Sequence, residues 1–431
     1  MERYTEYKDS GVKWIGEVPK EWTVGKLKHY AQLAPSCCNK PKDPETEIEY
    51  TPMEYIKQGY FIPNSSRASK LPTSLTEYDE GDIVMAKVTP CFENGNIAIM
   101  RNLRACFGVG SSELFVIRPQ NIDPIFLLYA LQNRAFVEAG AASMTGAGGL
   151  KRVSPIFIKN APICYPDSKT QQEIVTYLDK KTAGIQSYIA ERKKELSLFE
   201  TLKKTEIAQA VTKGLNHDAP MQDSGITWLG KIPAHWELKR LKSVLVDRNE
   251  PNDPVKTDFI LSLTNDRGVI PYADKGAVGN KAKEDLTKYK LAYPDDIVLN
   301  SMNVHIGSVA LSSYFGCVSP VYYMLHVRNL QHSVRYFNYL FQTKELQHDL
   351  HKYGKGILDI RMRIPIQALN MVILPVPPTD EQQAIVDYIE GRISQIDSYI
   401  TAINEELEQL RQYKQLLISD AVTGKIKVFN E

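Results

Sequence analysis

The chain has 431 residues, 43% of them hydrophobic and 24% charged, and this ordinary globular composition excludes disordered, collagen-like and mucin-like proteins. Its 52 lysines and arginines nearly balance its 51 aspartates and glutamates (pI ≈ 7.6), so any nucleic-acid site has to be a local patch. No apolar run reaches the ~20 residues that span a membrane, the charged N-terminal segment is unlike a signal peptide, and six cysteines without a C-x-x-C spacing indicate reduced thiols in a cytoplasmic protein.

The sequence contains a long internal repeat. Residues 9–22 (DSGVKWIGEVPKEW) and 223–236 (DSGITWLGKIPAHW) share seven identical positions, including both tryptophans. The matches continue along the chain with a period of about 211–214 residues, which is too long for a solenoid and indicates a duplicated module of a mixed domain followed by a long helix. The predicted domains are 1–166, a helical spacer at 167–215, a second lobe at 216–377 and a second spacer at 378–431. A bilobed protein that simply needs more core is the alternative, but two similar lobes more naturally bind two similar targets.

The first lobe, from about residue 20 to 166, is predicted to mix short strands with one helix. Expected strands are 83–88, 97–101, 114–118 and 161–165, the expected helix is 124–138, and Asn94–Gly95 predicts a turn. A glycine-rich basic loop at 145–152 precedes the last strand, where glycine permits close backbone approach to a ligand and cations can meet phosphates. Lysine and asparagine are also side chains that read guanine and adenine edges. The candidate DNA-binding residues of this lobe are Lys87, Thr89, Asn94, Asn96, Lys151 and Arg152.

The first long helix is predicted at 171–213, where proline is absent. Ser168-x-x-Gln171 predicts a capping box at its start. Apolar side chains recur at heptad spacing, and the predicted seam includes Ile185, Ile189, Leu196 and Phe199. A helix of about forty residues is roughly 60 Å long, and a stripe of that length requires a partner.

The second lobe, from about residue 237 to 377, repeats the pattern of the first. Expected strands are 297–300, 307–311, 321–327 and 371–374, and the expected helix is 332–351. A second glycine-rich basic loop lies at 353–363. The candidate DNA-binding residues are Asn300, Asn303, His305, Lys355, Arg361 and Arg363. Any single one of them is explained as an ordinary polar residue of a loop. Their recurrence in both lobes favours a binding site.

The second long helix is predicted at 382–424, again with a capping box, Thr379-x-x-Gln382. Its heptad seam includes Ile396, Ile400, Ile403, Leu407 and Leu410. Packing antiparallel against the first helix of the same chain is the favoured arrangement, and an inter-chain coiled coil is the alternative. The seam is interrupted by charged residues, which we interpret first as solvated edges and otherwise as determinants of register or partner contact: Arg192, Lys203, Glu206 and Lys414.

Motifs of catalysis are absent from the sequence. It contains no Walker loop, no dinucleotide-binding G-x-G-x-x-G after a strand, no Asn/Asp-Pro-Pro-aromatic tetrapeptide of amino-methyltransferases, and neither H-E-x-x-H nor G-x-S-x-G. We therefore predict a chain with no catalytic residues, no metal site and no cofactor of its own.

The repeated Trp-Ile-Gly or Trp-Leu-Gly-x-x-Pro-x-x-Trp segment, followed by a variable lobe and a proline-rich exit into a Gln-Gln helix, resembles the specificity subunit of type I restriction–modification systems. The resemblance covers essentially the whole chain. Residues 376–383 (VPPTDEQQ) are similar to the family's Pro-Pro-x-x-Glu-Gln junction. The first copy at 165–172 (YPDSKTQQ) departs from it, keeping one proline and placing Thr170 where the family has glutamate.

This resemblance implies an α+β fold with two target recognition lobes in pseudo-two-fold repeat, joined by two long helices that form an antiparallel coiled coil. Each lobe would read one half of a split, asymmetric site in double-stranded DNA. The helices would set the gap and bind two modification subunits, which carry S-adenosylmethionine and methylate adenine. Restriction subunits that translocate DNA with ATP and Mg would join them, in the cytoplasm and without a membrane.

Two other functions are compatible with the residues. One is a coiled-coil interaction scaffold with two lectin- or peptide-binding lobes. The other is a stand-alone nuclease or methyltransferase, which the missing cofactor and metal motifs argue against.

Overall fold

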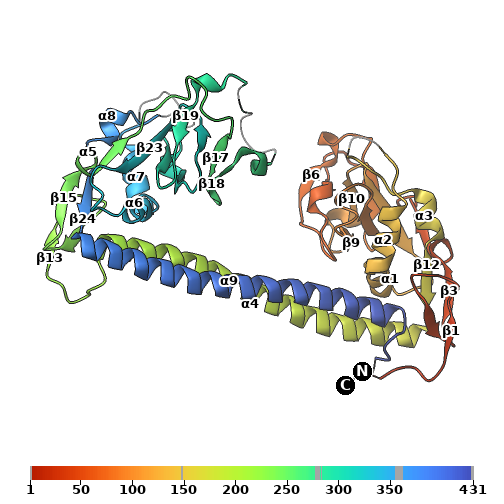
Figure 1. The fold of residues 1–431 in the computed structure, drawn as a ribbon. Coiled ribbons are helices and arrows are strands. Elements are labelled where there is room, and N and C mark those ends of the chain that lie inside the picture. Colours follow the sequence, from red (N-terminus) through yellow and green to blue (C-terminus); the bar gives the residue numbers. More distant parts are fainter. Residues whose placement is uncertain (1, 147–148, 277–281, 283, 355–362, 429–431) are drawn as a thin grey trace. The chain divides into compact units, whose positions relative to one another are not determined.

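The computed structural model describes most of the chain as two compact units. The described residues are 2–146, 149–276, 282, 284–354 and 363–428. The first unit comprises Met1–Arg192 and Asn404–Glu431, and the second comprises Lys193–Ile403. Each combines a mixed lobe with parts of two long helices, α4 (Ser168–Lys213) and α9 (Thr379–Val422), which continue unbroken from one unit into the other (Figure 1).

The first lobe is built on two four-stranded sheets. Its strands are β1 (Tyr7–Asp9), β2 (Glu17–Pro19), β3 (Thr23–Lys26), β4 (Ala31–Leu33), β5 (Glu47–Thr51), β6 (Ser65–Arg67), β7 (Thr76–Asp79), β8 (Ile83–Ala86), β9 (Ile97–Ile99), β10 (Phe107–Gly110), β11 (Leu114–Pro119) and β12 (Pro162–Tyr165). Its helices are α1 (Pro124–Leu131), α2 (Arg134–Ala142) and α3 (Pro155–Asn160). The sheets have the orders β4-β11-β8-β9 and β6-β5-β10-β7.

The second lobe repeats the first of these sheets. Its strands are β13 (Met221–Asp223), β14 (Lys231–Pro233), β15 (Glu237–Arg240), β16 (Leu245–Asp247), β17 (Leu261–Thr264), β18 (Gly268–Pro271), β19 (Lys290–Ala292), β20 (Ile297–Asn300), β21 (Val309–Leu311), β22 (Gly316–Val318), β23 (Tyr322–Val327) and β24 (Ile373–Val376). Its helices are α5 (Leu241–Val244), α6 (Val334–Phe341), α7 (Lys344–His351) and α8 (Ile366–Leu369). The sheet β16-β23-β20-β21 corresponds to β4-β11-β8-β9.

Strand β8 is apolar throughout, and the equivalent β20 is apolar up to its last residue, Asn300, because both faces of these strands are buried. In β8, Ile83 and Met85 pack in the cluster that contains α1 residues, whereas Val84 and Ala86 pack in a second cluster with Tyr78 of β7. Successive side chains of a strand point to opposite faces, so a short continuous apolar run fits a strand between two cores. Strand β20 divides its side chains between two clusters in the same way.

All eight expected strands are present within two residues of their predicted limits, but the two expected lobe helices are wrong as single helices. The segment 124–138 forms α1 and α2, separated at Asn133, whose extended backbone (ψ 127) and side-chain oxygen, accepting from the N–H of Ala135, start a new helix. The segment 332–351 likewise divides into α6 and α7 at Thr343, whose ψ is 136. At each break a second short helix begins in a new direction. The spacing of the apolar residues does not reveal such a break.

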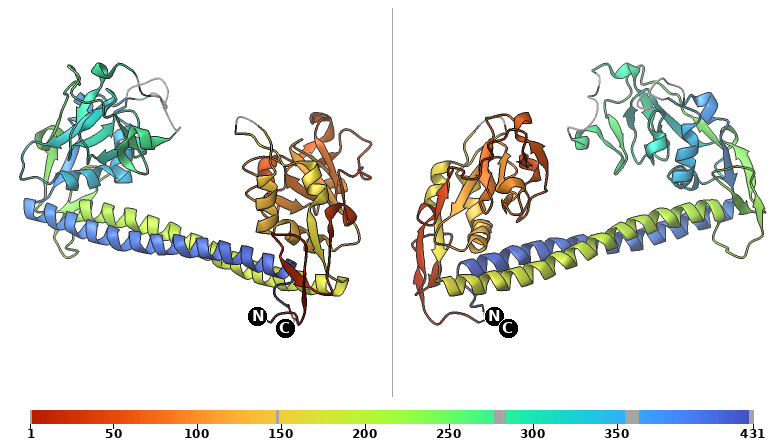
Figure 2. Two further views of the ribbon diagram at one scale, coloured as in Figure 1. Left: turned by 45° about the vertical axis from the view of Figure 1, so that its right-hand side comes forward. Right: turned by 180° about the vertical axis from the view of Figure 1, so that it is seen from behind.

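The long helices run side by side in each unit (Figures 1 and 2). None of the nine named seam residues is exposed. Higher-numbered residues of α4 meet lower-numbered residues of α9, as in the pairs Arg192–Glu406 and Lys203–Asp397, so the coiled coil is antiparallel and forms within one chain. Phe199 and Tyr399 stack with ring centroids 5.5 Å apart.

Three of the four charged interruptions of the seam are paired across the helices, so their interpretation as solvated edges is wrong. Arg192 donates to Glu406 at 2.8 Å, and Lys203 binds both oxygens of Asp397 at 2.7 and 2.8 Å. Glu206 accepts from Arg392 at 3.2 Å. Among the residues that the structure describes, Lys414, the fourth interruption, forms no such pair across the helices.

The expected capping boxes are also replaced by a different arrangement. Asp167 caps α4, with its carboxylate accepting from the N–H groups of Lys169 and Thr170 at 3.0 and 3.1 Å. The glutamines instead attach the helices to the lobes: Gln171 and Gln382 are buried, and each accepts a bond from the backbone N–H of the residue that caps α1 or α6. A neutral amide with both a donor and an acceptor is well suited to such a buried junction.

Candidate nucleic-acid interface

The first lobe contains a cleft of about 1070 Å³ at the end of β8. It is lined by three cations, two carboxylates and an apolar floor. These residues include Lys87, Arg152, Lys159, Glu77, Glu113, Leu33, Leu114, Phe115 and Val116. A concave site of mixed apolar and charged lining is the usual form of a binding site in proteins.

Lys87 lies on the floor of this cleft. Its ammonium donates to the carbonyl of Ser112 at 2.8 Å and lies 5.1 Å from the centre of the Phe115 ring. Burial lowers the pKa of Lys87, an effect that Glu113 opposes and Arg152 reinforces. The cation is therefore held against an aromatic face in a fixed position, with part of its hydrogen-bonding capacity still available to a ligand.

Arg152 closes one side of the cleft through a two-pronged bond to Glu113. Its Nε and Nη2 donate to the two carboxylate oxygens at 2.9 and 2.6 Å, which lowers the pKa of Glu113. The next residue, Val153, donates its N–H to the carbonyl of Lys87 at 3.0 Å and thereby ties the glycine-rich loop to the end of β8. Planar guanidinium–carboxylate geometry of this kind is also how arginine binds phosphate.

The other candidate residues of the first lobe divide between two places. Thr89 accepts from the backbone N–H of Lys151 at 2.8 Å, which holds these two residues beside the cleft, with the Lys151 side chain exposed. Asn94 and Asn96 lie in the confirmed turn between β8 and β9, where Gly95 has a φ of 67°. Gly95 lines a different cavity, so this turn is a surface of its own.

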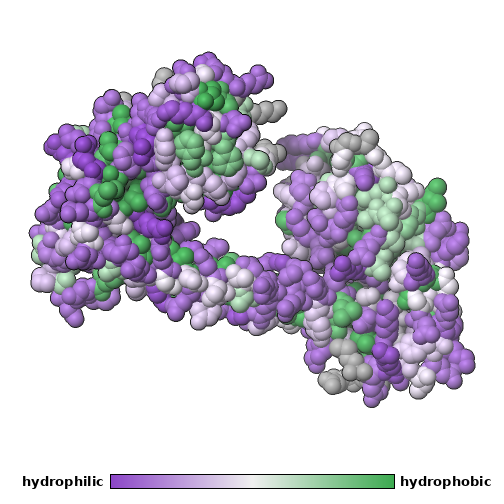
Figure 3. Space-filling view, viewed as in Figure 1, coloured by the Kyte–Doolittle hydropathy of each residue, from purple (hydrophilic) through white to green (hydrophobic). Residues whose placement is uncertain are grey.

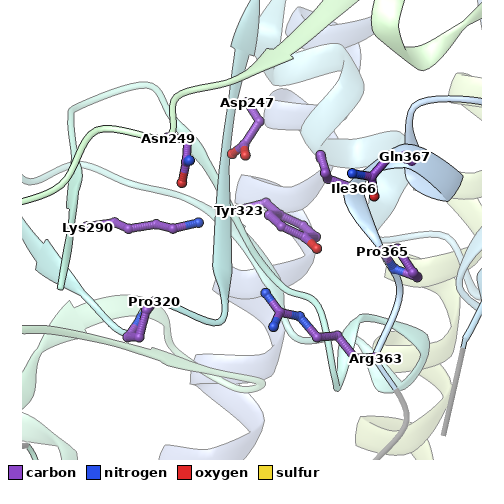
Figure 4. A pocket seen from close by; sticks show the side chains of 9 residues that line it. All are labelled: Asp247, Asn249, Lys290, Pro320, Tyr323, Arg363, Pro365, Ile366 and Gln367. Atoms are coloured by element: carbon purple, nitrogen blue, oxygen red, sulfur yellow. The ribbon is translucent and has the colours of Figure 1, made fainter. Parts of the chain in front are cut away.

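The second lobe contains a smaller cleft, of about 560 Å³. Figure 4 shows the ammonium of Lys290, the carboxylate of Asp247 and the guanidinium of Arg363 turned toward the space beside the Tyr323 ring. Lys290 donates to the carbonyl of Tyr322 at 3.2 Å and lies 5.5 Å from the centre of the Tyr323 ring. Burial lowers the pKa of Lys290 and raises that of Asp247.

The two clefts occupy equivalent places in the repeat. Phe115 pairs with Met85 in the first sheet, and Tyr323 pairs with Leu299 at the same register in the second. The residue after Arg363, Ile364, donates its N–H to the carbonyl of Ser301 at 2.9 Å, just as Val153 binds the residue after β8. Each cleft therefore has an aromatic ring and an arginine at equivalent positions and a lysine near the ring, but the lysines come from different places in the lobe: Lys87 follows β8, and Lys290 begins β19.

Three further candidates of the second lobe lie at the end of β20 and in the segment that follows it, and two lie outside the described residues. Asn300 is buried and accepts from the N–H of Met302 at 3.0 Å, so its side chain supports the turn. Asn303 is exposed, and the ring of His305 lies 5.3 Å from that of His351. The two predicted cations that fall on undescribed residues are Lys355 and Arg361.

Sequence reasoning missed Glu113, Phe115, Asp247, Lys290 and Tyr323. Each lies on or next to a strand, and the alternation of polar and apolar residues along that strand explains it as an ordinary part of the sheet. The signal that could have found two of them is the repeat: aligning β11 with β23 places an aromatic residue, Phe115 and Tyr323, at one position in both lobes.

Replacing Glu113 by glutamine is expected to strengthen binding to all DNA sequences several-fold at low salt. The change removes the carboxylate that neutralises Arg152, so the cleft gains one cation and the slope of log K against log salt becomes steeper by about 0.9. Salt titrations of DNA binding by the assembled complex measure this slope. Glu45→Gln, which frees Arg67 away from the cleft, is the control; an equal effect of both variants would contradict a special role of the cleft.

Replacing Asp247 by asparagine is expected to make the second lobe more stable at pH 7. Burial raises the pKa of this carboxyl above its unfolded value of about 3.9, so its contribution to stability is fully present below that pH and is lost as the pH rises through the folded pKa. Asparagine retains the acceptor for the N–H of Met324. Denaturant unfolding of both chains from pH 4 to 7 should show a difference that shrinks toward pH 4; a constant difference would contradict the assignment.

The described residues contain neither a cluster suited to a metal ion nor a helix suited to a membrane. Across the residues that the structure describes, no group of three or more His, Cys, Asp or Glu side chains is arranged to hold a metal ion. In the same part of the chain, no helix combines the length and apolarity needed to cross a bilayer.

A duplicated lobe with a cationic cleft at the equivalent place in each copy, built on a coiled coil of two long helices, defines a two-lobed recognition protein. The family model of the type I restriction modification DNA specificity domain matches residues 19–198 and again 233–409. The chain therefore belongs to the specificity subunits of type I restriction–modification systems, a non-catalytic family of subunits with target recognition domains.

Relatives of known name agree with this assignment. The chain is 34% identical to the EcoAI specificity subunit of Escherichia coli over 164 residues, which are 37% of this chain and only 28% of that relative. It is 22% identical to the putative MjaX specificity subunit of Methanocaldococcus jannaschii over 444 residues, covering 98% of each.

Solved structures agree in fold. One, from a study of complex assembly and conformational transition of the type I R-M system, superposes with a TM-score of 0.70 at 18% identity, covering 95% of this chain and 99% of that one. The HsdS subunit from Thermoanaerobacter tengcongensis superposes with a TM-score of 0.50 at 19% identity, covering 95% and 98%.

Proposed function

We propose that each lobe reads one half of a bipartite, asymmetric site in double-stranded DNA, and that its cationic cleft forms part of the reading surface. The observation that carries this proposal is the occurrence of a cationic cleft at the equivalent place of each lobe: Phe115 and Arg152 correspond to Tyr323 and Arg363, and a lysine lies near each ring, Lys87 in one lobe and Lys290 in the other. Lysine and arginine donors are suited to guanine edges and to phosphates.

The clefts differ at positions that support an asymmetric site. Leu33 pairs with Ile117 in the first sheet, and the equivalent position in the second, opposite Leu325, is Asp247. A carboxylate accepts hydrogen bonds, for example from the amino group of cytosine, whereas leucine offers only apolar contact. Two lobes of one fold with different linings are therefore suited to different half-sites.

The long helices are proposed to set the gap between half-sites and to recruit two modification subunits, with restriction subunits joining the complex. Apolar spots interrupt the otherwise hydrophilic surface of these helices (Figure 3). The exposed apolar residues of the helices include Leu198 (59% exposed) and Tyr399 (58%) in the second unit and Leu416 (58%) in the first. Exposed apolar side chains on a soluble helix favour a partner surface.

In this proposal the chain performs recognition and no chemical step. S-adenosylmethionine for adenine methylation, and ATP and Mg for translocation, belong to the partner subunits. The absence of nucleotide-binding and methyltransferase motifs from the sequence supports this division.

A genome-wide map of N6-methyladenine tests the proposal. Cells that express this chain with the modification subunit of its system are compared with cells that lack only this chain. A new split motif that depends on the chain is expected, and it reports both half-sites and the gap. An assembled complex that adds no methylation would contradict the proposal and favour a scaffold that binds other ligands.

A further inference from the structure

The internal repeat allows each half of the coiled coil to be compared with the other. Lys203 of α4 and Lys414 of α9 occupy equivalent seam positions, as Gln171 and Gln382 do at the helix starts. In the second unit, Lys203 lies between both oxygens of Asp397, at 2.7 and 2.8 Å. The residue of α4 that corresponds to Asp397 is Gln186. The first unit therefore keeps the lysine and lacks the carboxylate.

Lys414 is partly buried without a counter-charge. Within the described part of the chain, its ammonium makes no hydrogen bond or ion pair. Burial lowers its pKa, and no neighbouring carboxylate raises it in return. Removing an ammonium from water is unfavourable unless a partner compensates, so the first unit carries an unfavourable charge that the second unit has neutralised.

Lys414 lines a cavity of about 420 Å³ in the first unit. Amide, hydroxyl and cationic side chains line it, together with Asp179. Its polar residues include Gln58, Tyr60, Arg101, Gln132, Gln186 and Lys414. The carboxylate of Asp179 accepts from the hydroxyl of Tyr129 at 2.7 Å and retains its charge, but it does not raise the pKa of Lys414. The cavity thus has two cations against one carboxylate, and it offers several amide donors to an anionic group.

We propose that this cavity receives an acidic side chain, aspartate or glutamate, of a modification subunit, with Lys414 and Arg101 as its partners. The inference rests on the proposed function, in which such a subunit binds the long helices. A carboxylate is favoured because the equivalent lysine in the other half of the repeat binds one. A backbone phosphate of duplex DNA is the other anion that two cations could bind, and the salt dependence of DNA binding distinguishes it from a carboxylate.

Two variants test the proposal through calorimetric titration of the full chain with the purified modification subunit. Gln186→Asp places an acid where the second unit has Asp397, so it should raise the melting temperature and lower affinity for the subunit about tenfold, because Lys414 is then neutralised within the chain. Lys414→Met retains the aliphatic length, removes the charge, and should also lower affinity about tenfold. Asp397→Asn is the matched control, expected to lower the melting temperature and leave affinity unchanged.

The outcomes separate the two proposals. Wild-type chain that fails to bind the modification subunit would overturn the proposed function and this inference with it. If the wild-type chain binds the modification subunit, and Gln186→Asp and Lys414→Met both bind it as tightly as the wild type does, the inference alone would be overturned. Unchanged subunit affinity combined with a shallower salt dependence of DNA binding by Lys414→Met would also overturn it and assign the lysine to phosphate contact.

Discussion

Replacing Lys87 by methionine is expected to weaken recognition of one half of the DNA site by roughly 5- to 150-fold and to leave the other half unchanged, which corresponds to the ~1–3 kcal/mol of a specific base contact. Methionine retains the apolar stem over Phe115 and removes only the ammonium that is fixed on the floor of the first cleft. The measurement is competition binding of the assembled complex against DNA libraries randomised in one half-site at a time.

Lys290→Met is the matched control, because Lys290 lies over Tyr323 in the second cleft and should affect the opposite half-site. Equal melting temperatures of the three chains exclude unfolding as the cause. If either variant changed both halves, or weakened all sequences to the same extent, the clefts would be general phosphate contacts rather than readers of sequence.

Replacing Arg118 by methionine is expected to destabilise the first lobe by about 3–5 kcal/mol, because it leaves buried carboxylates without their counter-charge. The guanidinium donates to both oxygens of Asp82 at 2.7 and 2.8 Å and to Asp79 at 2.8 Å. Asp82 is 1% exposed, so water cannot replace the lost bonds. Denaturant unfolding of the wild-type and variant chains measures the difference.

The second lobe provides the comparison for this prediction. Arg248 approaches one carboxylate, Asp296, at longer distances of 3.2 to 3.4 Å, so Arg248→Met should cost less. Replacing Asp79 and Asp82 by asparagine together with Arg118→Met should recover most of the lost stability, since no uncompensated charge then remains. A single Arg118→Met variant as stable as the wild type would contradict the buried ion-pair assignment.

The strands and long helices were predictable because local patterns define them. Ile83 to Ala86 and Ile297 to Leu299 are short apolar runs of strand length, and the heptad stripes of α4 and α9 are long enough to exclude other structures. The division of 124–138 into α1 and α2 was not predictable in this way. It depends on the conformation of Asn133, which is a common helix-capping residue but is also compatible with a helix interior.

The candidate site was predictable only in part. Arg152 and Arg363 were found because cations in glycine-rich loops are conspicuous in a sequence, and Lys87 was found because it follows a recognisable strand. Glu113 and Lys290 were not found, because a charged residue next to a strand usually faces solvent. Strand pairing and loop tethering bring them to the clefts from positions tens of residues away.

The structure decided that the two long helices pair antiparallel within one chain, since the heptad pattern also allowed an inter-chain coiled coil. The sequence by itself determined the duplication, the α+β class of each lobe, the two heptad helices and the motifs that resemble the family. These follow from identities and periodicities that repeat over many residues. Only the tertiary structure decided which charges are neutralised: Lys203 and Lys414 are identical in type and in heptad position, yet one binds a carboxylate and the other faces a cavity. Electrostatic interactions depend on separations of a few ångströms between elements distant in the chain, and neither composition nor periodicity encodes those separations.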